Sequence, residues 1–146
     1  MKTVIIPKKI INDTLKTKAK KGNRPLDPMA TLAKINNLPF KIIEDKKSTN
    51  MPELHVNIGD LFHCLEGTVN FICGGVLTDR SYEVNLDGTY NKNEIKGIAI
   101  INGSTYTLQP GDWIWIPPNT PHQHNTSSTV RLMIIKVPLS IMKNHK

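Results

Sequence analysis

The stretch that decides the fold of this chain is GDWIWIPPNTPHQH, residues 111–124. It joins an alternating run of aromatic and β-branched residues, Trp113 to Ile116, to a pair of prolines and then to two histidines. Alternation of this kind is typical of a strand, and prolines restrict the turn that follows. We therefore expect a strand that leads, through a rigid turn, to a defined position for His122.

The rest of the chain repeats short apolar runs separated by turn residues. Runs rich in β-branched and aromatic residues begin at Phe40, and pairs such as Asp87-Gly88 separate them. Many short strands with frequent turns predict an all-β sandwich or barrel. The run DPMATLAKI has the chemistry of a helix start, with Asp27 as N-cap and Pro28 in the first turn. We expect one short helix there, after an irregular segment over residues 1–26.

The distribution of charge indicates one barrel domain preceded by a basic segment. The chain has 146 residues, which is enough to bury a core without disulfides. Residues 1–50 contain 12 Lys and Arg against 4 Asp and Glu, whereas residues 51–146 contain 7 against 8. We therefore expect a basic N-terminal extension over residues 1–37 and a β-barrel domain over residues 38–146.

The basic extension does not have the features of a nucleic-acid-binding segment. It has no aromatic residue before Phe40 to stack on bases, and it matches no nucleic-acid motif. We interpret it as a solvated arm or as an arm that packs on a neighbouring subunit.

The sequence also bears on the cellular compartment. No apolar run approaches the roughly 18 residues of a membrane span, and Pro7 interrupts the short apolar patch near the N-terminus. Cys64 and Cys73 flank a predicted hairpin turn at Glu66-Gly67, which would not set them opposite each other, so no disulfide is expected. Reduced thiols and the lack of a signal peptide predict a cytoplasmic protein with no membrane partner.

Four side chains near two turns form a mixed set of imidazoles and carboxylates. Glu53 and His55 lie two residues apart, so on a strand they point to the same face. Asp60 opens the next strand after a predicted turn at residues 57–59, and His122 follows the proline turn. Imidazole and carboxylate suit divalent Fe, Mn, Ni, Zn or Co rather than a thiolate-selective site. The four residues are therefore our candidate metal ligands.

At these positions the chain resembles the two signature motifs of the cupin superfamily. In the first motif, His55 stands at the second histidine and Gly67 at the closing glycine. In the second motif, Gly111, Pro117 and His122 all match. The resemblance covers most of the chain, and it implies a small jelly-roll barrel that is usually loaded with a divalent metal and is often dimeric.

Two positions depart from the cupin pattern. Glu53 replaces the first histidine, and Asp60 replaces the glutamate with a carboxylate that is one methylene shorter. His55, Asp60 and His122 would still make the two-His-one-carboxylate face of non-haem iron oxygenases. Asp60 then binds directly, if its strand lies closer, or acts through water. Glu53 is a fourth ligand, a group behind the ligands or a general base.

Neighbouring residues receive supporting roles. His124 alternates with His122, so it either lines the pocket, where it and Glu53 would move protons, or lies on the rim. Trp113 and Trp115 share one face of their strand, which we expect to be covered, as at a dimer interface. Arg131, on the last strand, is the only cation that we place near the cavity.

The residues leave the reaction open. We favour a metal-dependent dioxygenase, or another oxidoreductase, that acts on a small molecule. The first alternative is a metal-dependent lyase or isomerase, in which the metal is a Lewis acid. The second is a non-catalytic module that binds a small molecule. The expected assembly is a homodimer, and nucleic acid is not an expected partner.

Overall fold

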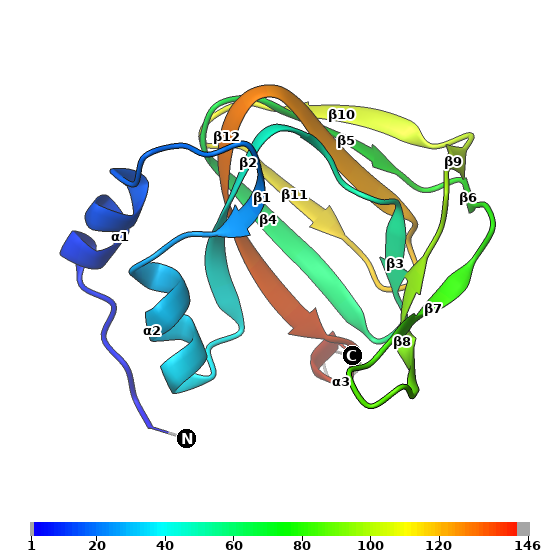
Figure 1. Ribbon diagram of the computed structural model, residues 1–146, viewed down its shortest axis with the longest axis horizontal. Coiled ribbons are helices and arrows are strands. Elements are labelled where there is room, and N and C mark those ends of the chain that lie inside the picture. The colour runs from blue at the N-terminus through cyan, green and yellow to red at the C-terminus, as the bar shows by residue number, and fades with distance from the viewer. Residues whose placement is uncertain (1, 143–146) are drawn as a thin grey trace.

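The computed structural model describes residues 2–142, and strands dominate it (Figure 1). Its strands, in chain order, are β1 (Gly22–Pro25), β2 (Phe40–Thr49), β3 (Glu53–His55), β4 (Ile58–Glu66), β5 (Val69–Cys73), β6 (Val76–Leu77), β7 (Ser81–Val84), β8 (Tyr90–Lys96), β9 (Ile100–Ile101), β10 (Ser104–Leu108), β11 (Trp113–Ile116) and β12 (His122–Pro138). The predicted all-β jelly-roll fold is confirmed.

Helices are few, although there are more of them than expected. The described residues contain α1 (Lys8–Leu15), α2 (Met29–Asn36) and α3 (Leu139–Met142). The predicted helix is α2, and the Asp27 carboxylate accepts a 3.0 Å hydrogen bond from the backbone N–H of Thr31 in its first turn. It ends where Asn37 adopts a left-handed conformation, with φ of 51°. Neither α1 nor α3 was expected.

The long strand β12 organises the barrel. Its later part lies between β4 and β2, where Leu132 pairs with Cys64 on one side and with Ile43 on the other. Its first residues pair instead with β5 and β3, since His122 lies opposite both Cys73 and Glu53. Figure 1 shows β12 arching over the top of the molecule, so that one strand takes part in both layers of the barrel.

The inner faces of these strands form the main core. Its centre holds a pair of tilted rings, Phe62 and Phe71, whose centroids lie 4.9 Å apart. Leu132 and Ile134 from β12 are buried against the same cluster. Because strand side chains alternate between faces, this core fixes which residues of β4 and β12 point into the barrel.

Two expected turns differ from the structure. Ile58 and Gly59, expected within a turn at residues 57–59, are instead the start of β4, and Gly59 lies under the ring of Trp115. A Cβ atom at residue 59 would lie 2.1 Å from that ring, so any larger residue there would force the Trp115 ring to move, and the glycine reflects a close approach rather than a turn. β4 and β5 both pair with β12 and do not form the expected hairpin. Cys64 and Cys73 are nevertheless unpaired, as expected.

The N-terminal segment is not the irregular, solvated arm that the sequence predicted. Helix α1 places Ile10, Ile11 and Leu15 against a second core that contains Leu26 and Ile42. β1 adds an edge strand to β2. The three apolar residues share one side of α1, and a short helix with such a face is stable only when that face is covered.

A buried ion pair ties this segment to the barrel. The Arg131 guanidinium donates to Glu44 Oε2 at 2.8 Å from Nη2 and at 3.0 Å from Nε. Arg131 also donates to the backbone carbonyls of Leu15 and Thr17. It therefore faces the N-terminal segment, and its expected position near the barrel cavity is wrong.

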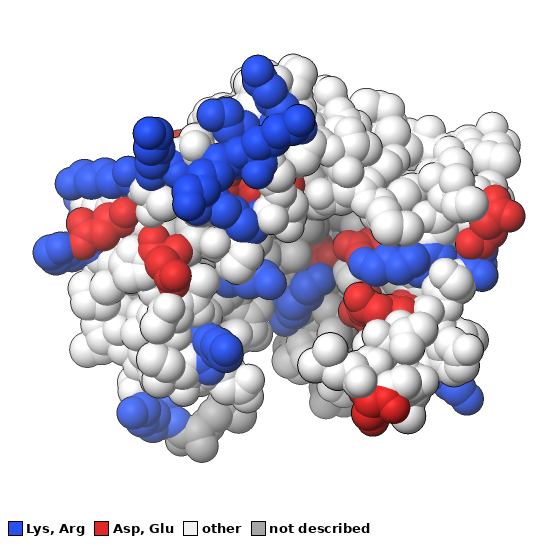
Figure 2. Space-filling view, in the orientation of Figure 1, with Lys and Arg blue, Asp and Glu red and all other residues white. Residues whose placement is uncertain are grey.

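The surface reflects the uneven charge of the sequence. Lys and Arg gather over the side of the molecule that carries α1 and β1, while the opposite half shows fewer of them (Figure 2). Figure 2 also shows a hollow between the half with α2 and the half with β3 and β8. No helix within residues 2–142 is long and apolar enough to cross a membrane.

Candidate metal centre

The centre begins with two neighbouring strands, β3 and β12. Glu53 and His55 point to the same side of β3, and Glu53 lies opposite His122 in the antiparallel register. The turn before His122 is held against β3, because the backbone N–H of Asn119 donates to the His55 carbonyl at 2.8 Å. Asn119 takes the left-handed conformation, with φ of 60°, which asparagine tolerates better than most residues.

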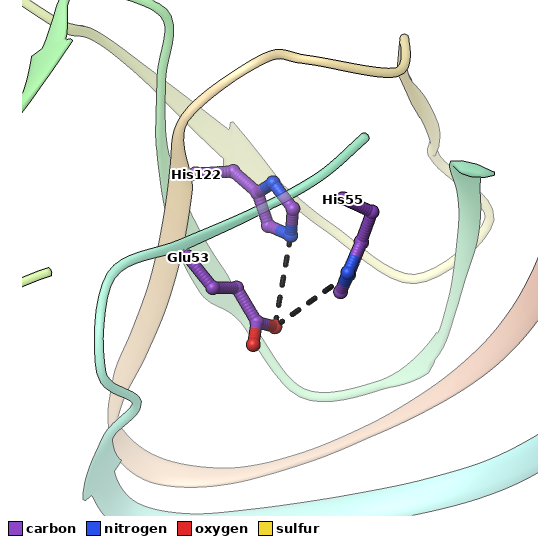
Figure 3. A group of neighbouring side chains, drawn as sticks. All are labelled: Glu53, His55 and His122. Carbon is purple, nitrogen blue, oxygen red and sulfur yellow. Dashed lines mark ion pairs between the residues drawn. The ribbon is translucent and has the colours of Figure 1, made fainter. Parts of the chain in front are cut away.

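These strands bring three side chains to one point. One ligand atom from each of Glu53, His55 and His122 lies within 4.8 Å of the other two (Figure 3). Glu53 Oε1 is 3.8 Å from His55 Nε2 and 3.7 Å from His122 Nε2. Both histidines are buried, whereas the Glu53 side chain keeps 23% of its surface exposed. Glu53 therefore lies at the open side of the cluster.

Asp60 approaches the two histidines of this cluster from β4. Its Oδ2 atom is 3.1 Å from His55 Nε2 and 3.4 Å from His122 Nε2. The position of its strand therefore brings the shorter side chain close to both histidines, and direct binding of a metal by Asp60 stays a prediction. Asp60 is 1% exposed, so its carboxylate faces the barrel interior rather than solvent.

The four residues fit a divalent transition metal. Asp60 Oδ2 and His122 Nε2 are buried and have no hydrogen-bond partner within the described residues. Two donor atoms on one metal with bonds of about 2.1 Å lie about 3.0 Å apart at right angles and about 3.4 Å apart in a tetrahedron. The separations of 3.1 to 3.8 Å are close to these values. Two nitrogens and two oxygens also match the preferences of Fe, Mn, Ni and Zn.

Strand β8 supplies two residues that the sequence analysis missed. His55 lies opposite Glu94 and Glu53 lies opposite Lys96. The His55 Nδ1–H group donates to Glu94 Oε2 at 2.7 Å, which leaves the Nε2 lone pair for a metal. The Lys96 ammonium donates to Glu53 Oε2. Glu94 and Lys96 alternate within a polar stretch, and this alternation was the available signal.

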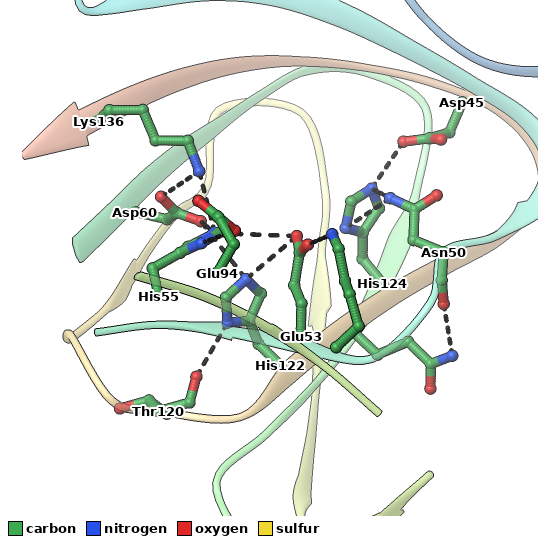
Figure 4. A network of polar contacts seen from close by, with 12 residues as sticks. Asp45, Asn50, Glu53, His55, Asp60, Glu94, Thr120, His122, His124 and Lys136 are labelled. Carbon is green, nitrogen blue, oxygen red and sulfur yellow. Dashed lines mark hydrogen bonds and ion pairs between the residues drawn. The ribbon is translucent and has the colours of Figure 1, made fainter. Parts of the chain in front are cut away.

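A third missed residue is Lys136, near the end of β12. Its Nζ atom donates to Asp60 Oδ1 at 2.7 Å and to His55 Nε2 at 3.1 Å (Figure 4). Lys136 alternates with Leu132 and Ile134, which point into the barrel core. The same alternation could have placed Lys136 in the cavity, where the sequence analysis placed no lysine.

His124 is buried but lies to one side of this cluster. Its Nε2 atom is 2.8 Å from Asp45 Oδ2, and Asn50 Nδ2 contacts the same ring (Figure 4). The ring packs between Phe62 and Phe71, with centroid distances of 5.8 and 5.2 Å. The inward orientation expected from alternation is what the structure shows, and the proposed role in proton movement stays a prediction.

The electrostatics of the centre hold its carboxylates charged. Burial alone would raise the pKa of Glu53, but His122 and Lys96 outweigh it and lower the pKa to about 2. Burial would also raise the pKa of Asp60, but His122, His55 and Lys136 outweigh this effect and hold the pKa well below its usual value. Burial lowers the pKa of His122, but Asp60 and Glu53 more than compensate and raise it to about 9. Without a metal, therefore, His122 carries a proton at neutral pH.

A cavity adjoins the centre. It has a volume of about 540 Å³ and lies between α2 and the ends of β2 and β12. Lys136 lines this cavity and also contacts Asp60 and His55. The cavity volume falls within the range of about 300 to 1,000 Å³ that is typical of small-molecule sites. The Lys136 side chain would thus contact both a ligand in the cavity and the residues of the centre.

Comparison with known families agrees with this architecture. Residues 96–144 match the model of the AraC-like ligand binding domain, a cupin-type fold, and this segment contains the second histidine motif. The jelly-roll barrel carries both motifs at one site. Over residues 96–144, about a third of its length, the chain is thus similar to a cupin-type ligand binding domain. A comparison of the chain with curated proteins gave no match.

Several solved structures are similar to this chain at low sequence identity. A cupin-2 domain containing protein from Shewanella frigidimarina is 16% identical over 88% of this chain and 91% of that one, with a TM-score of 0.48. The EutQ protein of Clostridium difficile is 16% identical over 68% of this chain, with a TM-score of 0.43. The Drosophila melanogaster CENP-C cupin domain is 12% identical over 67% of this chain, with a TM-score of 0.47. The match spans only 56% of the EutQ chain and 56% of the CENP-C chain.

Proposed function

We propose that this protein binds one divalent transition metal through Glu53, His55, Asp60 and His122, and that a small molecule binds next to this site, in the adjoining cavity lined by Lys136. The proposal rests on the buried atoms Asp60 Oδ2 and His122 Nε2, which face each other at 3.4 Å as an ion pair and make no hydrogen bond. A buried polar atom without a hydrogen bond costs about 1 to 3 kcal/mol. A metal ion would satisfy both atoms at once.

Residues around the ligands support such a site. A bound divalent ion would supply Lewis acidity to a carbonyl or carboxylate group. Glu94 orients the His55 ring through Nδ1, so Nε2 faces the centre. The Lys96 ammonium neutralises the negative charge of Glu53 by donating to its outer oxygen, Oε2. Lys136 places a positive charge beside Asp60, where it stabilises negative charge on a bound molecule.

The position of Lys136 bears on the reaction class. An ammonium group beside the ligands favours chemistry that builds up negative charge on an oxygen, as in a lyase or isomerase. The face formed by His55, Asp60 and His122 supports the dioxygenase hypothesis instead. We place the lyase or isomerase first because Lys136 is an observation specific to this chain, and we keep the dioxygenase as the second candidate. A module that binds without catalysis would use the same ligands.

A metal titration tests the proposal. Zn(II), Mn(II), Ni(II) and, without oxygen, Fe(II) would be titrated into the parent protein and an Asp60→Asn variant by calorimetry. Asp60→Asn keeps the shape of the side chain but removes its charge, so the affinity should fall at least about tenfold. Asp112→Asn, at an exposed position, is the matched control and should bind as the parent does. Equal affinities in all three proteins would remove Asp60 from the site, and no binding in any of them would refute it.

A further inference from the structure

The cavity beside the centre is apolar on most of its wall. Ala33 on α2, Leu38, Phe40 on β2 and Ile134 on β12 line it. Ile134 belongs to the barrel core, and Ala33 belongs to the second core beneath α2. The cavity therefore lies where the two cores meet, and an apolar group within it would be removed from water on several sides.

The charged groups around this wall are mainly cations. Lys34, Lys41 and Lys136 line the cavity, and its acidic residue is Asp27. The Asp27 carboxylate is already engaged by the backbone N–H and the hydroxyl of Thr31, at 3.0 and 2.7 Å. Within residues 2–142, neither Lys34 nor Lys41 has an ion-pair partner. The charges around the cavity therefore favour the binding of a negatively charged molecule.

Lys136 connects the cavity to the centre. Its ammonium group has three N–H donors, and Asp60 Oδ1 and His55 Nε2 accept two of them. One donor therefore remains for the cavity. His55 Nε2 has a single lone pair, so it cannot accept from Lys136 and bind a metal at the same time. Metal binding would release a second donor of Lys136 to the cavity.

We propose that the ligand of this cavity is a carboxylic acid with an apolar body. The carboxylate contacts Lys136, and the apolar body lies against Leu38, Phe40 and Ile134. The proposal rests on the proposed function only in one respect, namely that the bound metal strengthens binding of the acid. Recognition by Lys136 and by the apolar wall does not require the metal.

Calorimetry with two matched probes tests this assignment. 4-Phenylbutanoate and its neutral amide, 4-phenylbutanamide, would be titrated into the full chain, with and without zinc. The parent should bind the acid at least about tenfold more tightly than the amide, since hydrogen bonds between charged groups are the stronger ones. Lys136→Met should lose that preference, and Lys136→Arg should keep most of it. Lys92→Met removes an exposed lysine from β8, outside the cavity, and should behave as the parent.

The possible results separate the two proposals. Acid preference that depends on Lys136 but is the same with and without zinc supports the ligand class and counts against the strengthening of acid binding by the metal. Zinc binding with equal affinities for acid and amide overturns the ligand class and leaves the metal site standing. Failure of the parent to bind either probe also overturns the ligand class. Far-ultraviolet circular dichroism shows whether Lys136→Met is folded. If it is not, the acid preference of Lys136→Arg is compared with that of the parent instead, and loss of the preference in Lys136→Arg overturns the ligand class.

Discussion

At the scale of single residues, the centre consists of ligand atoms that are positioned by neighbours from other strands. Glu94 is the clearest case, because its only polar contact among the residues described is the 2.7 Å hydrogen bond from His55 Nδ1. Such partners fix the tautomer and orientation of a ligating imidazole. The contribution of Glu94 should therefore be visible in metal affinity rather than in folding.

We predict that Glu94→Gln weakens zinc binding by about tenfold or more. Glutamine keeps an oxygen that accepts the hydrogen bond but loses the negative charge that supports His55 as a ligand. Competition against a chromophoric chelator measures the affinity. Glu83→Gln, at an exposed position on β7, should change it little. If both variants bind zinc as the parent does, Glu94 has no part in orienting His55.

We also predict that metal affinity rises with pH. In the metal-free protein the pKa of His122 is raised to about 9 by Asp60 and Glu53, against the lowering effect of burial. A metal must displace this proton, so the apparent affinity should rise by about tenfold per pH unit below that value. Apparent zinc dissociation constants at pH 6, 7 and 8 measure the slope. A flat profile over this range would mean that no proton leaves His122.

At the scale of elements, the site depends on how closely β11 approaches β4. Gly59 lies under the Trp115 ring, and a Cβ atom there would lie 2.1 Å from a ring carbon. Asp60 is the next residue, so displacement of this strand would also displace a proposed ligand. The contact links the Trp-rich strand that opened the sequence analysis to the centre.

We predict that Gly59→Ala destabilises the protein by about 1 to 3 kcal/mol, as overpacking of a close contact does. Urea denaturation measures the free energy of unfolding. In a Trp115→Ala background the same substitution should cost much less, because the ring that it would contact is gone. Equal costs in the two backgrounds would show that the Trp115 ring is not the obstacle.

Elements were predictable where their pattern is local. The strands around Trp113 and Ile43 follow from alternation and β-branched composition, and α2 follows from Asp27 and Pro28. Helix α1 was missed because most of its residues are polar or basic, and its apolar side is meaningful only once a core lies beneath it. The start of β4 was missed because Gly59 indicates a turn in sequence, whereas in the structure it makes room for a ring.

In the proposed site, too, some residues were predictable from local sequence pattern and others depend on tertiary contacts. Glu53, His55, Asp60 and His122 follow from motif spacing and strand parity. Their partners Glu94 and Lys136 depend on which strands pair with β3 and β4, and sequence alone does not give that pairing.

At the scale of the whole molecule, one buried ion pair joins segments that are far apart in sequence. Glu44 and Arg131 are 87 positions apart, and Glu44 is fully buried. Arg24 donates to the other carboxylate oxygen at 3.0 and 3.1 Å. Burial raises the pKa of Glu44, but Lys20, Arg131 and Arg24 outweigh it and lower the pKa. The N-terminal segment therefore packs as part of the fold.

We predict that Glu44→Ala costs about 3 to 5 kcal/mol of stability, because it leaves the buried Arg131 guanidinium without its nearest counter-charge. Limited proteolysis should then cut near residues 16–21, between α1 and β1. Asp13→Ala, which breaks an exposed ion pair with Lys9, should cost less than about 1 kcal/mol. A similar small cost for both variants would mean that the N-terminal segment is held by apolar contacts alone.

The outer face of β11 suggests a second copy of the chain. Trp113 and Trp115 are 54% and 42% exposed, and the Trp113 ring stacks on His63 at a centroid distance of 4.0 Å. Exposed aromatic clusters are typical of interfaces. We predict a homodimer that a Trp113→Ser, Trp115→Ser variant converts to a monomer, as measured by light scattering. A parent that is monomeric at high concentration would contradict this assembly.

The central claim is that the four residues Glu53, His55, Asp60 and His122 hold a metal. The most direct test is elemental analysis of protein purified without a histidine tag or a chelator, beside a His55→Ala, His122→Ala double variant. We expect about one transition-metal ion per chain in the parent and none in the variant. A parent that stays metal-free after being offered Fe(II), Mn(II), Ni(II) and Zn(II), or a variant that keeps the ion, would contradict the claim.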